Sequence, residues 1–352
     1  MSTTLPLASR DADTRAIGRW LMVCCVVLFA LIMLGGATRL TESGLSIVEW
    51  KPVTGILPPM GDAEWQAELD RYRDSPQYVK VNRGMSLDEF KLIFWYEYAH
   101  RLLARVLGLC FALPYFWFLL RGRIPPTLRW PLFGTLLLGA AQGYMGWYMV
   151  KSGLVDIPRV SHYRLAAHLG LALMIFAAMF WIGSRALWPR ARDAARTSRL
   201  VWLVAAFLVF TILFGAFVAG LRAGLVYNTF PLMGGQFVPP NFLSFDPVIL
   251  NFLENPGTVQ FVHRWLAIST LMLIGLLVWR LRALPLSGSQ RQAMWLLLGA
   301  VLLQVSLGIA TLLLHVPVWL GTLHQGGAVV LLAALLWLGG RGLPNGSRIN
   351  NR

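Results

Sequence analysis

Long apolar segments alternate with short polar or Pro/Gly-rich joints along most of the chain. A helix needs about 20 mostly apolar residues to cross the hydrocarbon core of a bilayer. Eight segments reach that length, which predicts eight transmembrane helices in an all-α integral membrane protein. They are Ile17–Thr38, Leu92–Leu120, Trp130–Val150, His162–Ser184, Leu200–Gly220, Val259–Trp279, Ala293–Leu314 and Gly321–Gly340. An even number of crossings places both termini on the same side of the membrane.

The basic residues of the joints indicate the orientation. Lys and Arg far outnumber Asp and Glu in the N-terminal tail, in joints 121–129, 185–199 and 280–291, and in the C-terminal tail. The joints 39–91, 151–164, 221–258 and 315–320 are nearly balanced. Since cytoplasmic loops are enriched in Lys and Arg, both termini are expected in the cytoplasm. The region before the first span lacks the features of a cleaved signal peptide, and we expect a bacterial inner membrane.

The composition agrees with a membrane protein. Hydrophobic residues make up 57% of the 352 residues and charged residues 13%, and the mean hydropathy is +0.59. A soluble globule of this size could not cover so much apolar surface with polar groups. A soluble enzyme, a disordered chain and a disulfide scaffold are therefore excluded. The net charge of +15 follows from the basic joints, and we expect no nucleic-acid partner.

The two halves of the chain repeat one another. Glu97, His100 and Arg101 of the first half recur, with the same spacing, as Gln260, His263 and Arg264 of the second. The other matching pairs are Gln142 with Gln304, Gly146 with Gly308, His168 with His324, and Gly44-Leu45 with Gly224-Leu225. Each half holds four spans in the same orientation, which predicts two tandem, pseudo-symmetric four-helix bundles.

The repeat also sets the expected domain boundaries. They are a cytoplasmic tail at 1–16, the first four-helix bundle at 17–184, a cytoplasmic linker at 185–199, the second bundle at 200–340 and a cytoplasmic tail at 341–352. The first bundle contains a long outer loop, 39–91, in which Asp62–Asp74 is expected to be helical. A second helix is expected from Ser86 onward, because Asp88 and Glu89 would stand in its first turn. A docking or lid role and a solvated loop are both compatible with this composition.

Four histidines occupy equivalent places near the outer ends of their spans: His100 and His168 in the first half, His263 and His324 in the second. Ionisable groups inside a membrane are costly and usually functional. Zinc usually takes three or four protein ligands, and copper usually adds Cys or Met. Two imidazoles facing each other across a four-helix bundle suit haem iron, whose porphyrin fills the other four positions. We therefore predict one haem site in each half, toward the outer leaflet.

Charged residues beside these histidines are further candidates. Arg101, Arg105 and Arg264 could pair with haem propionates or extend toward the outer headgroups. Glu97 lies on the same helix face as His100 and is an acid/base candidate, with an ion pair to Arg101 as the alternative. Its counterpart in the second half is Gln260, so only the first half has such a carboxylate.

Other polar residues in or near the spans are expected to serve packing. Gln142 and Gln304 recur in mid-span and are expected to form hydrogen bonds between helices. His162 and His315 have no match in the repeat and are interpreted as interfacial packing residues. The three cysteines lie within spans, where they are expected to pack as small apolar residues.

The chain resembles the haem A synthase family over about residues 15–340. The resemblance rests on the eight spans, the repeat, Glu97-x-x-His100-Arg101, His168, His263-Arg264 and Gly321-Thr-Leu-His324-Gln325. The stretch Leu34-Gly-Gly-Ala-Thr-Arg-Leu-Thr-Glu-Ser-Gly-Leu-Ser46 resembles the end of the first span in the alphaproteobacterial and mitochondrial branch of that family.

This resemblance implies an oxidoreductase that converts the C8 methyl group of haem O into a formyl group through hydroxylated intermediates, giving haem A for terminal cytochrome oxidases. It implies that His263 and His324 bind the iron of a haem b cofactor. It also implies that His100 and His168 face the iron of the substrate haem O, with Glu97 as the catalytic carboxylate. Some members carry a cysteine pair in an outer loop. This chain has none there, so a thiol step is not expected.

The expected partners are haem O and haem A, membrane lipid and an electron donor that the sequence does not identify. The farnesyltransferase that forms haem O, oxidase assembly factors and a second copy of the chain are further candidate partners. Two other functions stay open at this point: a di-haem b-type electron carrier, such as a quinol-linked cytochrome subunit, and a transporter with histidine proton relays. Since a bis-histidine iron has no open position, either a first-half histidine leaves the substrate iron, or the methyl group is oxidised by electron removal and trapped by water.

Overall fold

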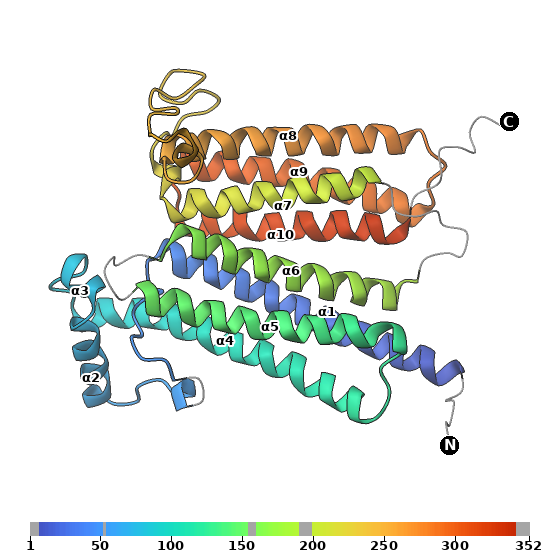
Figure 1. Ribbon diagram of the computed structural model, residues 1–352, viewed down its shortest axis with the longest axis horizontal. Helices are drawn as coiled ribbons and strands as arrows, with labels where there is room; N and C mark the ends of the chain where they lie inside the picture. Colours follow the sequence, from blue (N-terminus) through green and yellow to red (C-terminus); the bar gives the residue numbers. More distant parts are fainter. Residues whose placement is uncertain (1–6, 52–53, 154–159, 190–198, 343–352) are drawn as a thin grey trace.

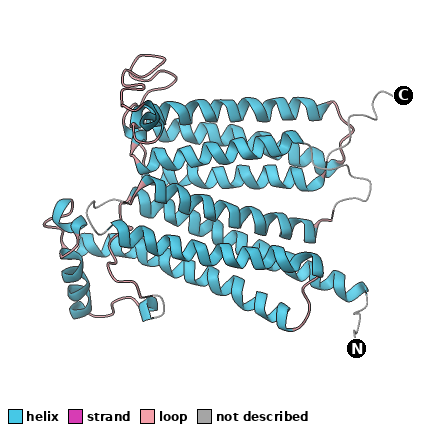
Figure 2. Ribbon diagram, in the orientation of Figure 1, coloured by secondary structure: helices cyan, strands magenta, loops and turns pink. Residues whose placement is uncertain are grey.

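The computed structural model describes residues 7–51, 54–153, 160–189 and 199–342, and this part of the chain is helical with no named strand. Figure 2 shows helices joined by loops throughout. The α-helices are α1 (Leu7–Leu40), α2 (Asp62–Arg73), α3 (Pro76–Lys80), α4 (Leu87–Leu120), α5 (Pro126–Gly153), α6 (His162–Leu187), α7 (Arg199–Gly220), α8 (Pro256–Arg282), α9 (Gly288–Leu313) and α10 (Val318–Arg341). Short 3₁₀ turns stand at Thr54–Ile56, Ala223–Leu225 and Val248–Phe252.

Seven helices of the described chain are long and apolar enough to cross a membrane: α1, α4, α6, α7, α8, α9 and α10. The chain is therefore a multi-pass membrane protein, as its sequence predicts. The third predicted span, Trp130–Val150, forms helix α5, but α5 is not in that set. Its glycines, Gln142 and several Tyr and Trp residues make it less apolar than the other long helices.

The long helices lie side by side along one common direction, and α2 and α3 project beyond one end (Figure 1). Helix α1 packs on α4 and α6, and α6 packs on α5. Helix α7 packs on α8, and α10 packs on α9. The two groups meet where α1 contacts α10 and where α6 contacts α7 and α10. Helix α1 begins and α10 ends at the same end of the molecule, opposite α2 and α3 (Figure 1).

Small residues allow the closest helix approach. An added Cβ on Gly18 of α1 would lie 3.1 Å from the carbonyl oxygen of Gly183 on α6, and an added Cβ on Gly183 would lie 3.2 Å from the carbonyl oxygen of Gly18. Helices in membranes commonly use such residues because lipid gives no hydrophobic drive for association. Cys24 and Cys25 are buried in the same core and are free thiols, as predicted.

An ion-paired cluster joins the two halves at the end of the long helices that carries α2 and α3, which we call the outer end (Figure 1). The guanidinium of Arg39, in the last turn of α1, donates to the carbonyl oxygens of Ala219 and Gly220 at the end of α7, over 3.0 and 3.1 Å. Glu42 forms an ion pair with Arg222 of the other half. Glu42 stands two positions before Gly44 and Arg222 two before the matching Gly224, so equivalent positions of the repeat meet each other.

The long first loop folds into an outer module on α4. Helix α4 begins with a reciprocal cap between Ser86 and Glu89, which confirms the predicted helix from Ser86 onward. The predicted surface helix is α2. Its Trp65, Leu69 and Tyr72 pack against Phe90 and Phe94 of α4 in a second apolar cluster. Burial there raises the pKa of Tyr72 to about 12. The part of the loop that forms α2 is thus packed on α4, whereas Ile56, Leu57 and Met60 before it are exposed.

Candidate functional site

The four candidate histidines lie on four different helices, two in each half. His100 is on α4 and His168 on α6, whereas His263 is on α8 and His324 on α10. The structure places a glycine of a neighbouring helix against each imidazole: Gly35 of α1 against His100, Gly146 of α5 against His168, Gly215 of α7 against His263 and Gly308 of α9 against His324. Each of the four long helices of a half thus contributes either a histidine or a glycine.

These glycines leave the space that the rings occupy. A Cβ added to Gly35, Gly146, Gly215 or Gly308 would lie 3.1, 3.4, 3.0 or 2.8 Å, respectively, from the nearest ring atom. The distances at Gly35, Gly215 and Gly308 are too short for the imidazole to keep its place, whereas the one at Gly146 is an ordinary contact. A residue without a side chain also lets a flat macrocycle approach the backbone closely. Gly35 and Gly215 occupy equivalent positions of the repeat, as do Gly146 and Gly308. The whole arrangement is therefore duplicated.

The separation of the second-half pair is compatible with two ligands to one metal ion. The ring centroids of His263 and His324 are 6.5 Å apart and the ring planes are perpendicular, at 88°. A metal–imidazole bond is about 2 Å long, and the ring centre lies about 1 Å beyond the nitrogen. Rings that share an ion would therefore have centroids about 6 Å apart. The observed separation fits.

His263 is held in the orientation that a metal ligand needs. Its Nδ1 lies 3.2 Å from the carbonyl oxygen of Thr211. A carbonyl only accepts hydrogen bonds, so Nδ1 carries the proton and Nε2 keeps its lone pair. The Thr211 hydroxyl bonds to that of Thr270 over 2.8 Å. The equivalent first-half positions, Leu31 and Leu107, are apolar.

The described residues contain no cluster of three or more His, Cys, Asp or Glu side chains that could hold a bare metal ion. Each site offers two imidazoles and the glycines that face them. This donor set matches an iron whose remaining ligands come from a porphyrin. The residues present therefore fit a haem in each half.

The two mid-span glutamines contact histidines rather than only bridging helices. Gln142 Nε2 lies 3.2 Å from His168 Nε2. Gln304 Nε2 lies 3.2 Å from His324 Nδ1 and donates to the carbonyl oxygen of His324 over 2.9 Å. The predicted hydrogen bonds between helices are thus present, and their partners are two of the four candidate histidines, His168 and His324.

Arg101 and Arg264 hold the outer loop of their own half in the same way. Arg101 donates to the carbonyl oxygens of Ile47 and Glu49, over 2.8 and 3.0 Å. Arg264 donates to those of Tyr227 and Thr229, over 2.7 and 2.8 Å. Tyr227 and Thr229 are the counterparts of Ile47 and Glu49 in the repeat. These contacts leave Arg264 Nε buried with no hydrogen-bond partner among the described residues.

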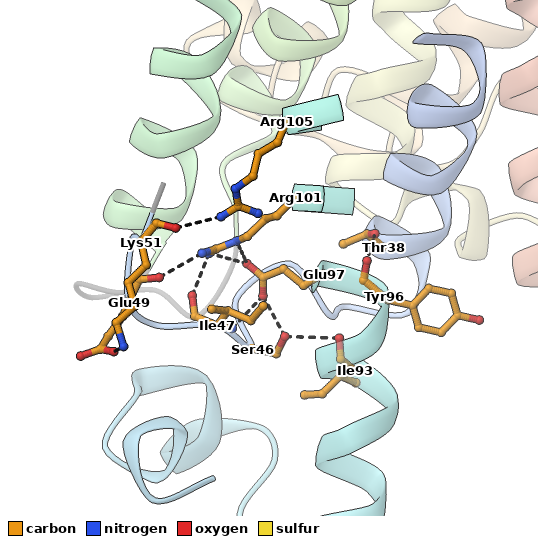
Figure 3. A network of polar contacts seen from close by, with 10 residues as sticks. All are labelled: Thr38, Ser46, Ile47, Glu49, Lys51, Ile93, Tyr96, Glu97, Arg101 and Arg105. Carbon is orange, nitrogen blue, oxygen red and sulfur yellow. Dashed lines mark hydrogen bonds and ion pairs between the residues drawn. The ribbon is translucent and has the colours of Figure 1, made fainter. Parts of the chain in front are cut away.

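Glu97 is the centre of a buried polar network in the first half (Figure 3). Its Oε2 accepts from the Ser46 hydroxyl and the Ile47 N–H, both over 2.8 Å. Its Oε1 accepts from Arg101 Nε and Nη2 over 3.0 and 2.7 Å. One turn further on, Arg105 donates to the Lys51 carbonyl over 2.8 Å. The ion pair expected as the alternative role of Glu97 is thus formed.

The second half reverses the polarity of that contact. Gln260, the counterpart of Glu97, donates through Nε2 to the carbonyl oxygen of Tyr227 over 3.1 Å, whereas Glu97 accepts from the N–H of the equivalent Ile47. Gln260 and Glu97 are both buried. Only the first half therefore keeps a carboxylate, together with a hydroxyl that can exchange protons with it.

A cleft of about 310 Å³ opens beside this network and is lined by Val48, Trp50, Trp147, Val150 and Lys151. The Arg101 guanidinium lies over the Trp50 ring, 5.4 Å from its centroid. Nearby, the Lys51 ammonium and Arg71 lower the pKa of Glu49 below its ordinary value, mainly through the hydrogen bond from Lys51. This cleft thus combines aromatic walls with basic groups.

His162 and His315 lie outside both sites. The His162 ring packs on Phe217, and its Nε2 is 3.6 Å from the carboxylate of Glu254. His315 is exposed in a turn with a positive φ of 62°. Sequence reasoning missed Gly35, Gly215 and Thr211. The constant offset between the first spans of the two halves was a signal that could have found the two glycines.

Comparison with known proteins identifies the family of the chain. The sequence profile of a family described as cytochrome oxidase assembly protein matches residues 18–336. A protein of Nitrosospira multiformis named heme A synthase is 50% identical, over 96% of this chain and 97% of its own length. Proteins with the same name from Sinorhizobium medicae and Mesorhizobium japonicum are each 49% identical, over 92% and 97% of this chain and 88% and 96% of their own lengths.

Proposed function

This chain belongs to the haem A synthase family of cytochrome oxidase assembly proteins, and we propose how its two halves divide that activity. Haem A synthesis is its function. In our proposal it is an oxidoreductase that acts on a CH group: the C8 methyl of haem O becomes a formyl group through hydroxylated intermediates. The relatives favour this function over the electron-carrier and transporter alternatives.

The duplicated pairing of histidine with glycine carries this proposal. His263 and His324 would hold haem b, and their perpendicular rings support the assignment. His100 and His168 would hold the substrate, haem O, against Gly35 and Gly146. Haem b supplies a redox centre that takes up and passes on electrons. Arg264, whose Nε has no partner among the described residues, is the best-placed cation for a propionate of that cofactor.

Glu97 would serve proton movement in the first site. Oxidising a methyl group to a formyl group releases protons, and these need an acceptor near the reacting carbon. Glu97 Oε2 and the Ser46 hydroxyl are joined by a 2.8 Å hydrogen bond and can pass a proton between them. Arg101 holds the other carboxylate oxygen and fixes its position. Arg105 and Arg101 would also keep the outer loop closed over the site.

We further propose that α5 is the third of eight transmembrane helices and that 17–184 and 200–340 form two tandem bundles. The packing of α5 on α6 supports this, as does the common end at which α1 begins and α10 ends (Figure 1). In this proposal that end faces the cytoplasm of a bacterial cell and the histidines lie toward the periplasmic side, which the basic joints support. An electron donor, the haem O-forming farnesyltransferase, oxidase assembly factors and a second copy of the chain are the proposed partners.

The test is the identity of the haems extracted from detergent-purified protein, by chromatography and mass, for wild type and for Glu97→Ala. Wild type should hold haem B together with haem O or haem A. The variant should accumulate haem O or a hydroxylated intermediate, with turnover reduced by about 100-fold or more. Glu49→Ala is the matched control, because Glu49 contacts Arg101 only through its backbone carbonyl. Haem B alone, unchanged by Glu97→Ala, would contradict the proposal.

A further inference from the structure

The two halves differ in how a glutamine meets a histidine. In each half the glutamine stands one helical turn before the glycine that faces the ring: Gln142 before Gly146 on α5, and Gln304 before Gly308 on α9. The helices and the spacing are equivalent. The ring nitrogen that the amide contacts is not.

In the second half the amide lies on the backbone side of the ring. Gln304 contacts His324 at two atoms, the ring Nδ1 and the backbone carbonyl oxygen of His324. Gln304 Oε1 is buried without a hydrogen-bond partner among the described residues. A rotation of the amide would offer that oxygen to a protonated Nδ1. Metal-bound histidines usually donate their second ring N–H in this way, so His324 is free to bind iron through Nε2.

In the first half the amide lies on the far side of the ring. Gln142 contacts His168 at Nε2, the nitrogen farther from the backbone. His168 Nδ1 is buried, and nothing in the described ranges forms a hydrogen bond with it. Either orientation of the amide can satisfy Nε2, because the amide offers both a donor and an acceptor. In the second half the glutamine amide contacts the nitrogen that would not bind iron. In the first half the Gln142 amide contacts Nε2, the nitrogen of His168 that would bind iron.

We propose that Gln142 is a positioning residue that engages His168 through Nε2 and makes it a weak, exchangeable ligand of the substrate iron. The first site then holds its haem mainly through His100 and keeps one axial position that a small molecule can reach. The second site would keep both His263 and His324 as ligands. This proposal rests on the proposed function, since it assigns the first site to the substrate haem.

The difference suits the tasks of the two sites. An electron-transfer haem benefits from two fixed axial ligands, because its coordination should not change with its charge. A haem whose own methyl group must react with oxygen from a small molecule benefits from an exchangeable position. The packing role expected for Gln142 would instead make it a link between α5 and α6 with no effect on iron ligation.

Carbon monoxide is a probe that separates these roles, because it binds ferrous haem only where an axial position is open or exchangeable. In reduced, haem-loaded wild type we expect carbon monoxide to bind the first-site haem and not haem b. In Gln142→Leu the amide is gone, so His168 should bind iron tightly. Affinity for carbon monoxide should fall by about tenfold or more, with a low-spin spectrum at both haems.

Two further variants separate an effect on iron ligation from an effect on packing. Gln304→Leu is the matched control and should leave carbon monoxide binding at the first site unchanged. The double variant Gln142→Leu/His168→Ala should restore it, because the competing imidazole has been removed. A packing role predicts lower thermal stability for Gln142→Leu but neither the loss of carbon monoxide binding nor its recovery.

The proposal is overturned if wild type binds carbon monoxide at neither haem, or if Gln142→Leu binds it as wild type does. Should Gln142→Leu fail to fold, His168→Ala alone decides. We expect His168→Ala to bind carbon monoxide at the first-site haem with about the affinity of wild type. A large increase in that affinity would show that His168 is a tight ligand in wild type. The proposed function is tested separately, by haem extraction. It would be contradicted by a wild-type protein that contains neither haem O nor haem A.

Discussion

The first and second halves set each histidine against a glycine and tie each outer loop to an arginine, yet they surround these shared contacts differently. The second half adds Thr211 and Thr270 behind His263. The first half has leucines there, a carboxylate at Glu97 and an outer module on α4. The backbone and the glycines thus define a duplicated helical scaffold around the four histidines. The residues that differ are the ones that can give one copy a reaction and the other a fixed cofactor.

The glycine contacts should give the largest effects. Gly308→Val places a side chain where a Cβ alone would lie 2.8 Å from the His324 ring, and it should abolish haem binding in the second half only. Gly146→Val should do the same in the first half. Haem content per chain, resolved by haem type, is the measurement. Gly299→Ala on α9 and Gly139→Ala on α5 are the controls, because an added Cβ meets nothing within 4 Å there. Loss of both haems from either valine variant would show that the halves are not separable.

Exchanging the polar residues at the loop contact should come next. Glu97→Gln breaks a buried ion pair with Arg101 and sets an amide against the Ile47 N–H, which should cost about 3 kcal/mol of unfolding free energy. Gln260→Glu turns a carboxylate toward the Tyr227 carbonyl, but the spare Nε of Arg264 can pair with it, so about 1 kcal/mol is expected.

Thermal or denaturant unfolding in detergent measures both variants. Limited proteolysis of loop 46–51 reports whether the loop has opened in Glu97→Gln. Equal destabilisation by the two exchanges would mean that the polarity of the contact is irrelevant and that the two loops are held by their arginines alone.

The ion pair between the halves should matter less. Arg222→Ala removes one of the two arginines that pair with Glu42 and leaves Arg39 in place. Both Glu42 and Arg222 are partly exposed, so about 0.5 kcal/mol is expected. The unfolding midpoint at low and high salt checks this value, because screening weakens such a pair. A loss of several kcal/mol would instead make this contact a principal link between the halves.

The smallest expected effect is on the pH dependence of stability, through Glu49 in the long loop of the first half. The pKa of Glu49 is lowered in the folded chain by Lys51 and Arg71, so its ionised form stabilises the fold above its ordinary pKa. That contribution is lost as the pH falls through the lowered value. The unfolding midpoints of wild type and Glu49→Gln should therefore differ slightly at neutral pH and converge in acid. A difference that grows in acid would have the wrong sign.

Much of this molecule followed from its sequence alone. The apolar runs determined the long helices, because a bilayer requires a known length of apolar chain. The polar stretches at Asp62 and Ser86 identified α2 and the start of α4 through local capping and charge. The repeat located all four histidines and showed that Glu97 has no acidic counterpart. Each of these rests on neighbouring residues or on a spacing that can be counted along the chain.

The tertiary structure decided what each of these residues touches. Helix rotations and contacts between helices determine that Gly35 faces His100 and that Arg264 holds Tyr227. They also determine which ring nitrogen each glutamine contacts: Nε2 of His168 for Gln142, and Nδ1 of His324 for Gln304. A sequence pattern specifies the face of a helix but not its rotation against a neighbour to that precision. Packing in the assembled bundle sets that rotation, because side chains far apart in the chain must fill the same space.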